Sequence, residues 1–153
     1  MNDEEIKEGA LAFIASQKTM VVATAGKDGI PHAATLYFLV DEHLNLYFAT
    51  GSETKKVEHL THSKKIAFVI GTGPDIVTVQ GGGSVEQIKE SDLVTIEKVG
   101  KELYDKATKE WPVLRIGHTG ISYFKLKPEW MVWLSLDKKA HPDSYYPDYH
   151  KVI

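Results

Sequence analysis

The most informative segment of the sequence is residues 46–56, which read Leu46-Tyr47-Phe48-Ala49-Thr50-Gly51-Ser52-Glu53-Thr54-Lys55-Lys56. Apolar residues alternate with other residues as far as Thr50, which is typical of a β-strand with one buried face. A glycine and a serine then interrupt the strand before a helical segment begins. We therefore predict a strand over 44–50, a tight turn, and a short helix over about 53–62.

The start of this short helix has the features of an anion-binding site. A helix N-terminus offers unpaired N–H groups and a partial positive charge. Lys55 and Lys56 fall in the first turn, where the helix dipole disfavours cations unless an anion is bound. The hydroxyls of Thr50, Ser52 and Thr54 would add donors to a phosphate. The alternative is an ordinary surface helix that Ser52 caps and whose lysines are solvated.

The residues on the N-terminal side predict a helix followed by antiparallel strands. Asn2 and Glu5 have the spacing of a capping box, and apolar residues then recur at helical spacing over 3–16. The period changes at a β-branched run over 20–25, and a second strand is predicted over 31–40. Short connections between these strands predict an antiparallel meander.

The residues on the C-terminal side extend the sheet. We predict strands over 65–70, 76–88 and 121–136, with Gly81 to Gly83 marking a bulge, a barrel corner or the close approach of a ligand. A second long helix is predicted between the last two strands, capped by Ser91, with Leu93, Ile96, Leu103 and Ala107 on one face. The whole chain, 1–153, is predicted to form a single α+β domain built on a small six-stranded antiparallel β-barrel with peripheral helices.

Two further segments are candidates for ligand binding. His32, Ala33, Ala34 and Thr35 leave the backbone of the second strand bare, so a flat ring could lie against it; the alternative is a half-buried strand in a tight barrel. Gln80 carries both a donor and an acceptor, which suit a ring edge or a polyol chain; the alternative is a solvent-facing strand residue.

Composition excludes several classes of function. The chain has 153 residues, a formal charge of −3 and no cysteine, which excludes disulfides, thiolate metal sites and a cysteine nucleophile. No metal site is predicted, because His59 and His62 look like surface residues without further ligands. The acidic N-terminus and the lack of a long apolar run predict a cytoplasmic protein that binds neither nucleic acid nor membrane.

The order of these segments resembles the pyridoxamine 5′-phosphate oxidase-like family of FMN-binding split barrels, from about Ile6 to Leu136. The blocks that carry the resemblance are Met20-Val21-Val22-Ala23-Thr24 before Asp28-Gly29-Ile30-Pro31-His32-Ala33, then Leu46-Tyr47-Phe48-Ala49-Thr50, then Lys55-Lys56-Val57 with Leu60, and Val77-Thr78-Val79-Gln80 before Gly83. The resemblance implies a six-stranded split barrel and a homodimer with a flavin at the subunit interface.

The resemblance also implies roles for individual residues. The FMN phosphate is expected at Thr50, Thr54, Lys55 and Lys56, and the isoalloxazine ring along 32–35. Gln80 matches a polar position that the resemblance implies on the neighbouring strand. Trp130 or Trp133 is expected to reach the partner's cofactor.

The strand over 33–38 has no Arg or Lys, unlike pyridoxamine phosphate oxidase proper. The chain is therefore more similar to the general-stress branch of the family, and we expect an FMN-dependent oxidoreductase that acts on a small molecule. The alternatives are an F420-dependent reductase and a non-catalytic flavin- or haem-binding module. Haem would need an axial ligand, for which the candidates are His32, His118, His141 and His150.

Overall fold

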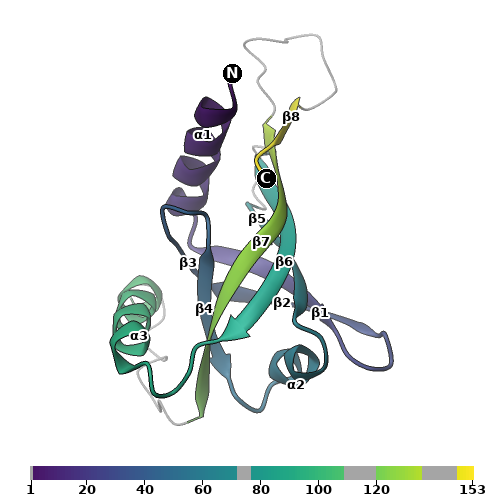
Figure 1. Cartoon of the computed structure of the whole chain (residues 1–153), viewed down its shortest axis with the longest axis vertical. Helices are drawn as coiled ribbons and strands as arrows, with labels where there is room; N and C mark the ends of the chain where they lie inside the picture. Colours follow the sequence, from purple (N-terminus) through teal and green to yellow (C-terminus); the bar gives the residue numbers. More distant parts are fainter. Residues whose placement is uncertain (1, 72–76, 109–119, 136–147) are drawn as a thin grey trace.

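A computed structural model describes residues 2–71, 77–108, 120–135 and 148–153. In these residues the chain forms a curled antiparallel sheet with helices around it (Figure 1). The elements, in chain order, are α1 (Asp3–Ser16), β1 (Thr19–Ala25), β2 (Pro31–Tyr37), β3 (Leu39–Val40), β4 (Leu46–Gly51), α2 (Lys55–His62), β5 (Lys65–Ile70), β6 (Thr78–Gln87), α3 (Leu93–Thr108), β7 (Ile121–Ser135) and β8 (Asp148–Lys151).

The sheet is an α+β split barrel, as predicted, but it has eight strands rather than six. The strand order is β2-β1-β5-β6-β7-β4-β3, with β8 on β7. The predicted strand over 31–40 breaks at Phe38, and its two parts lie at opposite ends of this order. β8 comes from the tail, for which no strand was predicted. β2 and β4 approach each other without pairing, and this is where the barrel is split.

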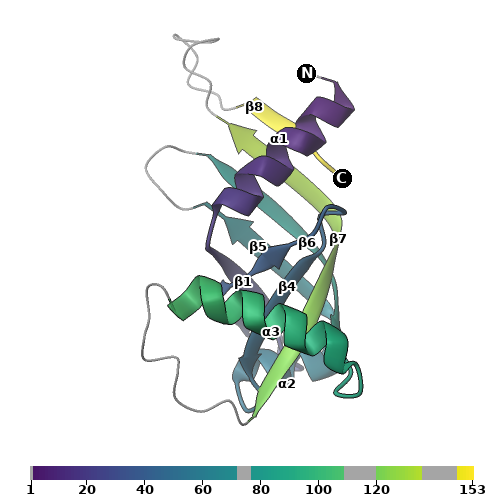
Figure 2. The ribbon, with the colours of Figure 1, turned by 90° about the vertical axis from the view of Figure 1, so that its left-hand side faces the viewer.

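Helix α1 begins as predicted. Asn2 accepts a hydrogen bond from the Glu5 N–H, and the Glu5 side chain accepts one from the Asn2 N–H, both at 2.9 Å. Ala10 and Ile14 are buried, and the helix lies beside β7 and β8 at one end of the barrel (Figure 2). A Cβ on Gly9 would come within 2.6 Å of the Trp133 ring, so glycine lets the helix pack closely on β7.

The glycine run in β6 contains the predicted irregularity. The pairing of β6 with β7 shifts register between Gly82 and Gly83. A Cβ on Gly83 would collide with the Lys127 carbonyl oxygen, and the Pro128 Cα would lie 2.8 Å away. Glu129 is the extra residue, so the bulge lies in β7, next to Pro128, and opposite it the glycine at 83 has no side chain to collide with that strand.

Helices α2 and α3 both start later than predicted. The N-cap of α2 is Thr54, because the Ser52 hydroxyl is 2.7 Å from the Ser122 hydroxyl instead. In α3 the Asp92 carboxylate accepts from the Thr95 N–H at 3.2 Å, so Asp92, not Ser91, provides the cap. Leu93 is 63% exposed and was wrongly placed on the buried face, which Val99, Leu103 and Ala107 form.

Candidate functional site

A groove of about 630 Å³ lies beneath α3, at the split between β2 and β4. Figure 2 shows α3 crossing β4 and β7. This volume is typical of a site for a cofactor or a small molecule. The residues that line the groove come from β1, β2, β4, α3 and β7: Thr19, Thr35, Leu36, Tyr37, Ala49, Thr50, Gly51, Gly100, Leu103, Tyr104, Ala107, Ile121 and Tyr123.

Lys106 holds α3 in this position. Its Nζ donates to the Phe38 carbonyl oxygen at 2.6 Å and lies 4.3 Å from the centre of the Phe38 ring. Burial, together with the charge of Lys18, lowers the pKa of Lys106. Phe38 lies between β2 and β3, so this hydrogen bond joins α3, which covers the groove, to the edge of the barrel.

The predicted phosphate residues meet at the turn from β4 into α2. Thr50 is buried at the end of β4, and its hydroxyl is 3.5 Å from that of Thr54. Thr54 makes no side-chain cap bond to the helix. The Glu58 N–H is the first to bond within α2, to the Thr54 carbonyl. The N-terminus of α2 is thus uncapped and carries Lys55, which is exposed, and Lys56, which is partly exposed.

The predicted ring-binding segment lies on the free edge of the sheet. β2 pairs only with β1 among the described strands. Ala33 and Thr35 are exposed on one face of β2, whereas His32 and Ala34 are half-buried on the other. Of the segment 32–35, Thr35 alone lines the groove.

His59 is not the surface residue that the sequence predicted. Its Nδ1 is 2.9 Å from the hydroxyl of the buried Thr24, and its ring meets that of His32 edge-on, with centroids 6.2 Å apart. Thr24 and His32 are opposite one another in the β1–β2 register. The His32 Nδ1 is buried and has no hydrogen-bond partner. This cluster connects α2 to β1 and β2. Among the described residues, no three His, Asp or Glu side chains come together as a metal site.

Gln80 and Trp133 do not join the groove. Gln80 is exposed on β6, which is separated from β2 by β1 and β5, so the expected neighbouring position is wrong. It nevertheless lies in one row with Thr35, because Thr35 is opposite Val21, Val21 opposite Val69, and Val69 opposite Gln80. Trp133 packs on α1 and on His150, toward the other end of β7 from Ser122.

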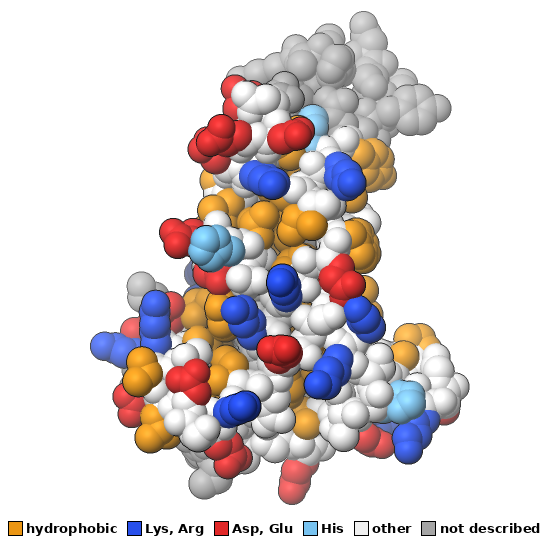
Figure 3. Space-filling view, viewed as in Figure 1, with side chains coloured by type: hydrophobic (Ala, Val, Ile, Leu, Met, Phe, Trp, Pro, Cys, Tyr) orange, Lys and Arg blue, Asp and Glu red, His pale blue; other side chains and the backbone are white. Residues whose placement is uncertain are grey.

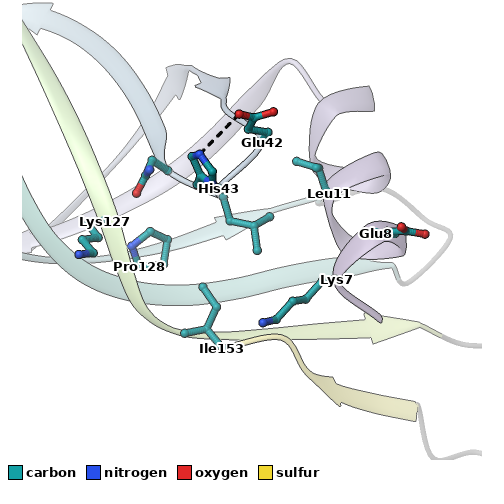
Figure 4. A pocket seen from close by; sticks show the side chains of 10 residues that line it. Lys7, Glu8, Leu11, Glu42, His43, Lys127, Pro128 and Ile153 are labelled. Atoms are coloured by element: carbon teal, nitrogen blue, oxygen red, sulfur yellow. Dashed lines mark ion pairs between the residues drawn. The ribbon is translucent and has the colours of Figure 1, made fainter. Parts of the chain in front are cut away.

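A second cavity, of about 480 Å³, lies between α1, the β3–β4 turn and the bend in β7 (Figure 4). It is lined by Lys7, Glu8, Leu11, Glu42, His43, Leu44, Asn45, Lys127, Pro128 and Ile153. Glu42 and His43 pair at 3.5 Å on its exposed rim. On the face shown in Figure 3, lysines gather over β4, β6 and β7 with acidic side chains between them. None of the predicted site residues lines this cavity.

Sequence reasoning missed the part of the groove that α3 and β7 supply. Tyr123 packs on α3 where a Cβ on Gly100 would lie 3.0 Å from its hydroxyl. The one available signal was Gly100 itself, because a glycine inside a helix costs about 1 kcal/mol relative to alanine and so points to close packing. Tyr123, which contacts Gly100, is more than twenty residues away along the chain, and no local sequence pattern identifies it.

Comparison with solved structures places this fold among known proteins. A conserved hypothetical protein of Mycobacterium tuberculosis, Rv2991, has a TM-score of 0.72 at 19% identity, with 95% of this chain and 92% of that chain covered. General stress protein 26 of Bacillus anthracis has a TM-score of 0.69 at 20% identity, with 96% and 98% covered.

A haem-binding protein of Mycobacterium smegmatis has a TM-score of 0.63 at 14% identity, and this chain spans 57% of it while 93% of this chain is covered. A search of curated proteins finds no match. The family model described as pyridoxamine 5′-phosphate oxidase matches residues 6–131. The split barrel and this match over most of the sequence lead to one conclusion: the chain belongs to the pyridoxamine 5′-phosphate oxidase-like family.

Proposed function

We propose that this protein binds FMN, with the phosphate at the N-terminus of α2. The observation that carries the proposal is the uncapped first turn of that helix, beside the hydroxyls of Thr50 and Thr54. Lys55 and Lys56 place two cations where the helix dipole alone disfavours them. A bound phosphate would accept hydrogen bonds from the free N–H groups and neutralise both charges.

The isoalloxazine ring would lie along β2, where the side chains of Ala33 and Thr35 are small and the strand edge is unpaired. An unpaired edge offers N–H and C=O groups to the polar atoms of a flavin. The flavin would supply the redox chemistry, passing electrons from a reduced nicotinamide to a small acceptor. The chain's own part would be to hold and orient the ring, and we assign it no catalytic acid or base.

We also propose that the protein is a homodimer with the cofactor at the subunit interface. The rows that cross the outer face of the sheet are small or apolar at most positions: Ala33, Ala23, Ala67, Gly82 and Trp130 in one, and Thr35, Val21, Val69, Gln80 and Val132 in the next. Trp130 is 47% exposed at the end of its row, which suits an aromatic contact with the partner. Trp133 packs on its own α1 and is a weaker candidate for that contact.

The test of the phosphate site is titration of FMN and riboflavin against wild type and the Lys55→Ala/Lys56→Ala variant. A charge-assisted hydrogen bond is worth about 1.5–3 kcal/mol, so we expect FMN to bind at least about tenfold more weakly to the variant. Riboflavin lacks the phosphate and should lose much less. Lys7→Ala/Lys127→Ala, at the second cavity, is the matched control. Equal losses for FMN and riboflavin would contradict a phosphate contact.

A haem-binding module is the second candidate, and two observations favour it. The half-buried His32 has an Nδ1 without a hydrogen-bond partner among the described residues, and the similar structure from Mycobacterium smegmatis is that of a haem-binding protein. His150 packs on Trp133, whereas His118 and His141 lie outside the described residues. The absorption spectrum after incubation with FMN, F420 or haemin separates the three cofactors. Binding of haemin with a Soret band that His32→Ala abolishes would replace the flavin proposal.

A further inference from the structure

The groove beneath α3 extends past the residues assigned to the flavin. Of the predicted cofactor residues, Thr35 and Thr50 line it, at the side nearest β2 and β4. On the α3 side it is lined by Leu103 and Ala107, while Ile121 of β7 lies next to Gly51 of β4 in the sheet. The α3 side therefore borders the proposed flavin site, and a second molecule bound there would lie beside the flavin.

The lining of the groove selects against charged ligands. Among the described residues that line it, no side chain is charged. Lys55 and Lys56 lie outside this lining, at the end of the groove next to Thr50, so a carboxylate or phosphate held against α3 would lose hydration without gaining an ionic partner, which is costly. Leu36, Leu103 and Ile121 instead offer apolar surface to a flat hydrocarbon ring.

Two tyrosines add a polar edge to this apolar groove. Within the described part of the chain, the hydroxyls of Tyr37 and Tyr123 have no hydrogen-bond partner, and both residues are only partly buried. Tyr123 is held in place against Gly100. A phenolic O–H is a good donor to a carbonyl oxygen on the rim of a ring.

We infer that the groove binds a flat, uncharged ring compound with carbonyl oxygens at its edge, a quinone, as the electron acceptor. The inference rests on the proposed flavin function. In the overall reaction a reduced nicotinamide supplies two electrons and one proton, solvent supplies the second proton, and the quinone is reduced to a hydroquinone. Tyr37 and Tyr123 would hold the carbonyl oxygens, and α3 would exclude water from the ring.

The test is calorimetric titration of the FMN-loaded protein with menadione. Ala107→Leu fills the groove from the α3 side and should weaken binding at least about tenfold. Val94→Leu is the matched control on the same helix, since Val94 is 81% exposed and outside the groove, and it should change nothing. Tyr123→Phe should weaken menadione binding about three- to tenfold and leave binding of 2-methylnaphthalene, which has no carbonyl, unchanged.

The possible failures are distinguishable. If the protein does not bind FMN, the proposed function fails, and titration of the flavin-free protein with menadione still tests the groove. If FMN binds but menadione does not, or binds equally well to wild type, Ala107→Leu and Tyr123→Phe, the inference is wrong while the flavin proposal stands. A sulfonated naphthoquinone that binds as tightly as menadione would also overturn it, because the groove would then not select against charge.

Discussion

At the scale of single residues, the turn between β3 and β4 shows how one side chain specifies a backbone path. Leu44 has a φ of 67°, a left-handed conformation that favours glycine, yet its side chain is buried in the core. The Asp41 carboxylate compensates by accepting from the N–H groups of His43 and Asn45, from the Asn45 amide and from the Tyr47 hydroxyl. Burial alone would raise the pKa of Asp41, but these hydrogen bonds outweigh it and lower the pKa.

We expect Asp41→Asn to lower the free energy of unfolding by about 1 kcal/mol at pH 7, because an amide NH₂ would face two donors. A carboxyl whose pKa is lowered by folding stabilises the protein above its unfolded pKa, and that contribution is lost as the pH falls through the folded value. The difference from wild type should therefore shrink below the ordinary pKa of 3.8. Urea unfolding of both proteins between pH 3 and 7 measures it, with the exposed Glu42→Gln as control.

The bulge in β7 opposite Gly83 leads to a second prediction at this scale. Gly83→Ala should lower the free energy of unfolding by about 2 kcal/mol or more, since its Cβ would collide with backbone atoms of β7 that cannot move independently. Gly51→Ala is the control, because its Cβ would meet only the Thr54 methyl at 3.4 Å. Equal stability of the two variants would show that β7 adjusts to the extra methyl.

At the scale of elements, local signals predicted what lies close together in the sequence. The capping box indicated the start of α1, and the glycine run of β6 indicated where its pairing with β7 becomes irregular. The missed features depend on distant partners: His59 bonds to Thr24, and β8 pairs with β7. The position of α3 over the groove could not be predicted from local sequence either, because it depends on a hydrogen bond between Lys106 and Phe38, which are far apart in the chain.

Lys106 makes the docking of α3 dependent on pH. Because folding lowers its pKa, the folded protein releases this proton at a lower pH than the unfolded chain does. The unfolded state then binds more protons, so this contribution to stability rises from the folded pKa up to about 10.5. Lys106→Met should remove that rise, and Lys101→Met, on the exposed face of α3, should keep it. Thermal unfolding of the three proteins between pH 7 and 11 provides the measurement.

At the scale of the whole molecule, the outer face of the sheet from β2 to β7 is not covered by another element in the described part of the chain. Its rows of small and apolar side chains cross five strands. The part of the chain that the structure describes has no helix long and apolar enough to cross a membrane. A second copy of the chain, related by two-fold symmetry, would cover this face.

The dimer proposal predicts the behaviour of Val69→Lys. Val69 lies at the centre of its row, so a lysine there would place an unpaired charge in the interface without entering the core. Wild type should sediment as a dimer at micromolar concentration, and the variant should dimerise at least about tenfold more weakly. Val94→Lys, on α3, is the matched control. A wild-type protein that sediments as a stable monomer would contradict the proposal.

The pairing of β7 has a consequence for how the protein is made. β7 is synthesised after β1–β6, and it pairs with β4, β6 and β8. Until residues 121–135 leave the ribosome, β4 has only the two-residue β3 as a partner, whereas β1, β2, β5 and β6 can already pair. The groove acquires its β7 side only after residues 121–135 are made, so loading of a cofactor there follows synthesis of this strand, and a ribosome stalled before it would hold an open and aggregation-prone sheet.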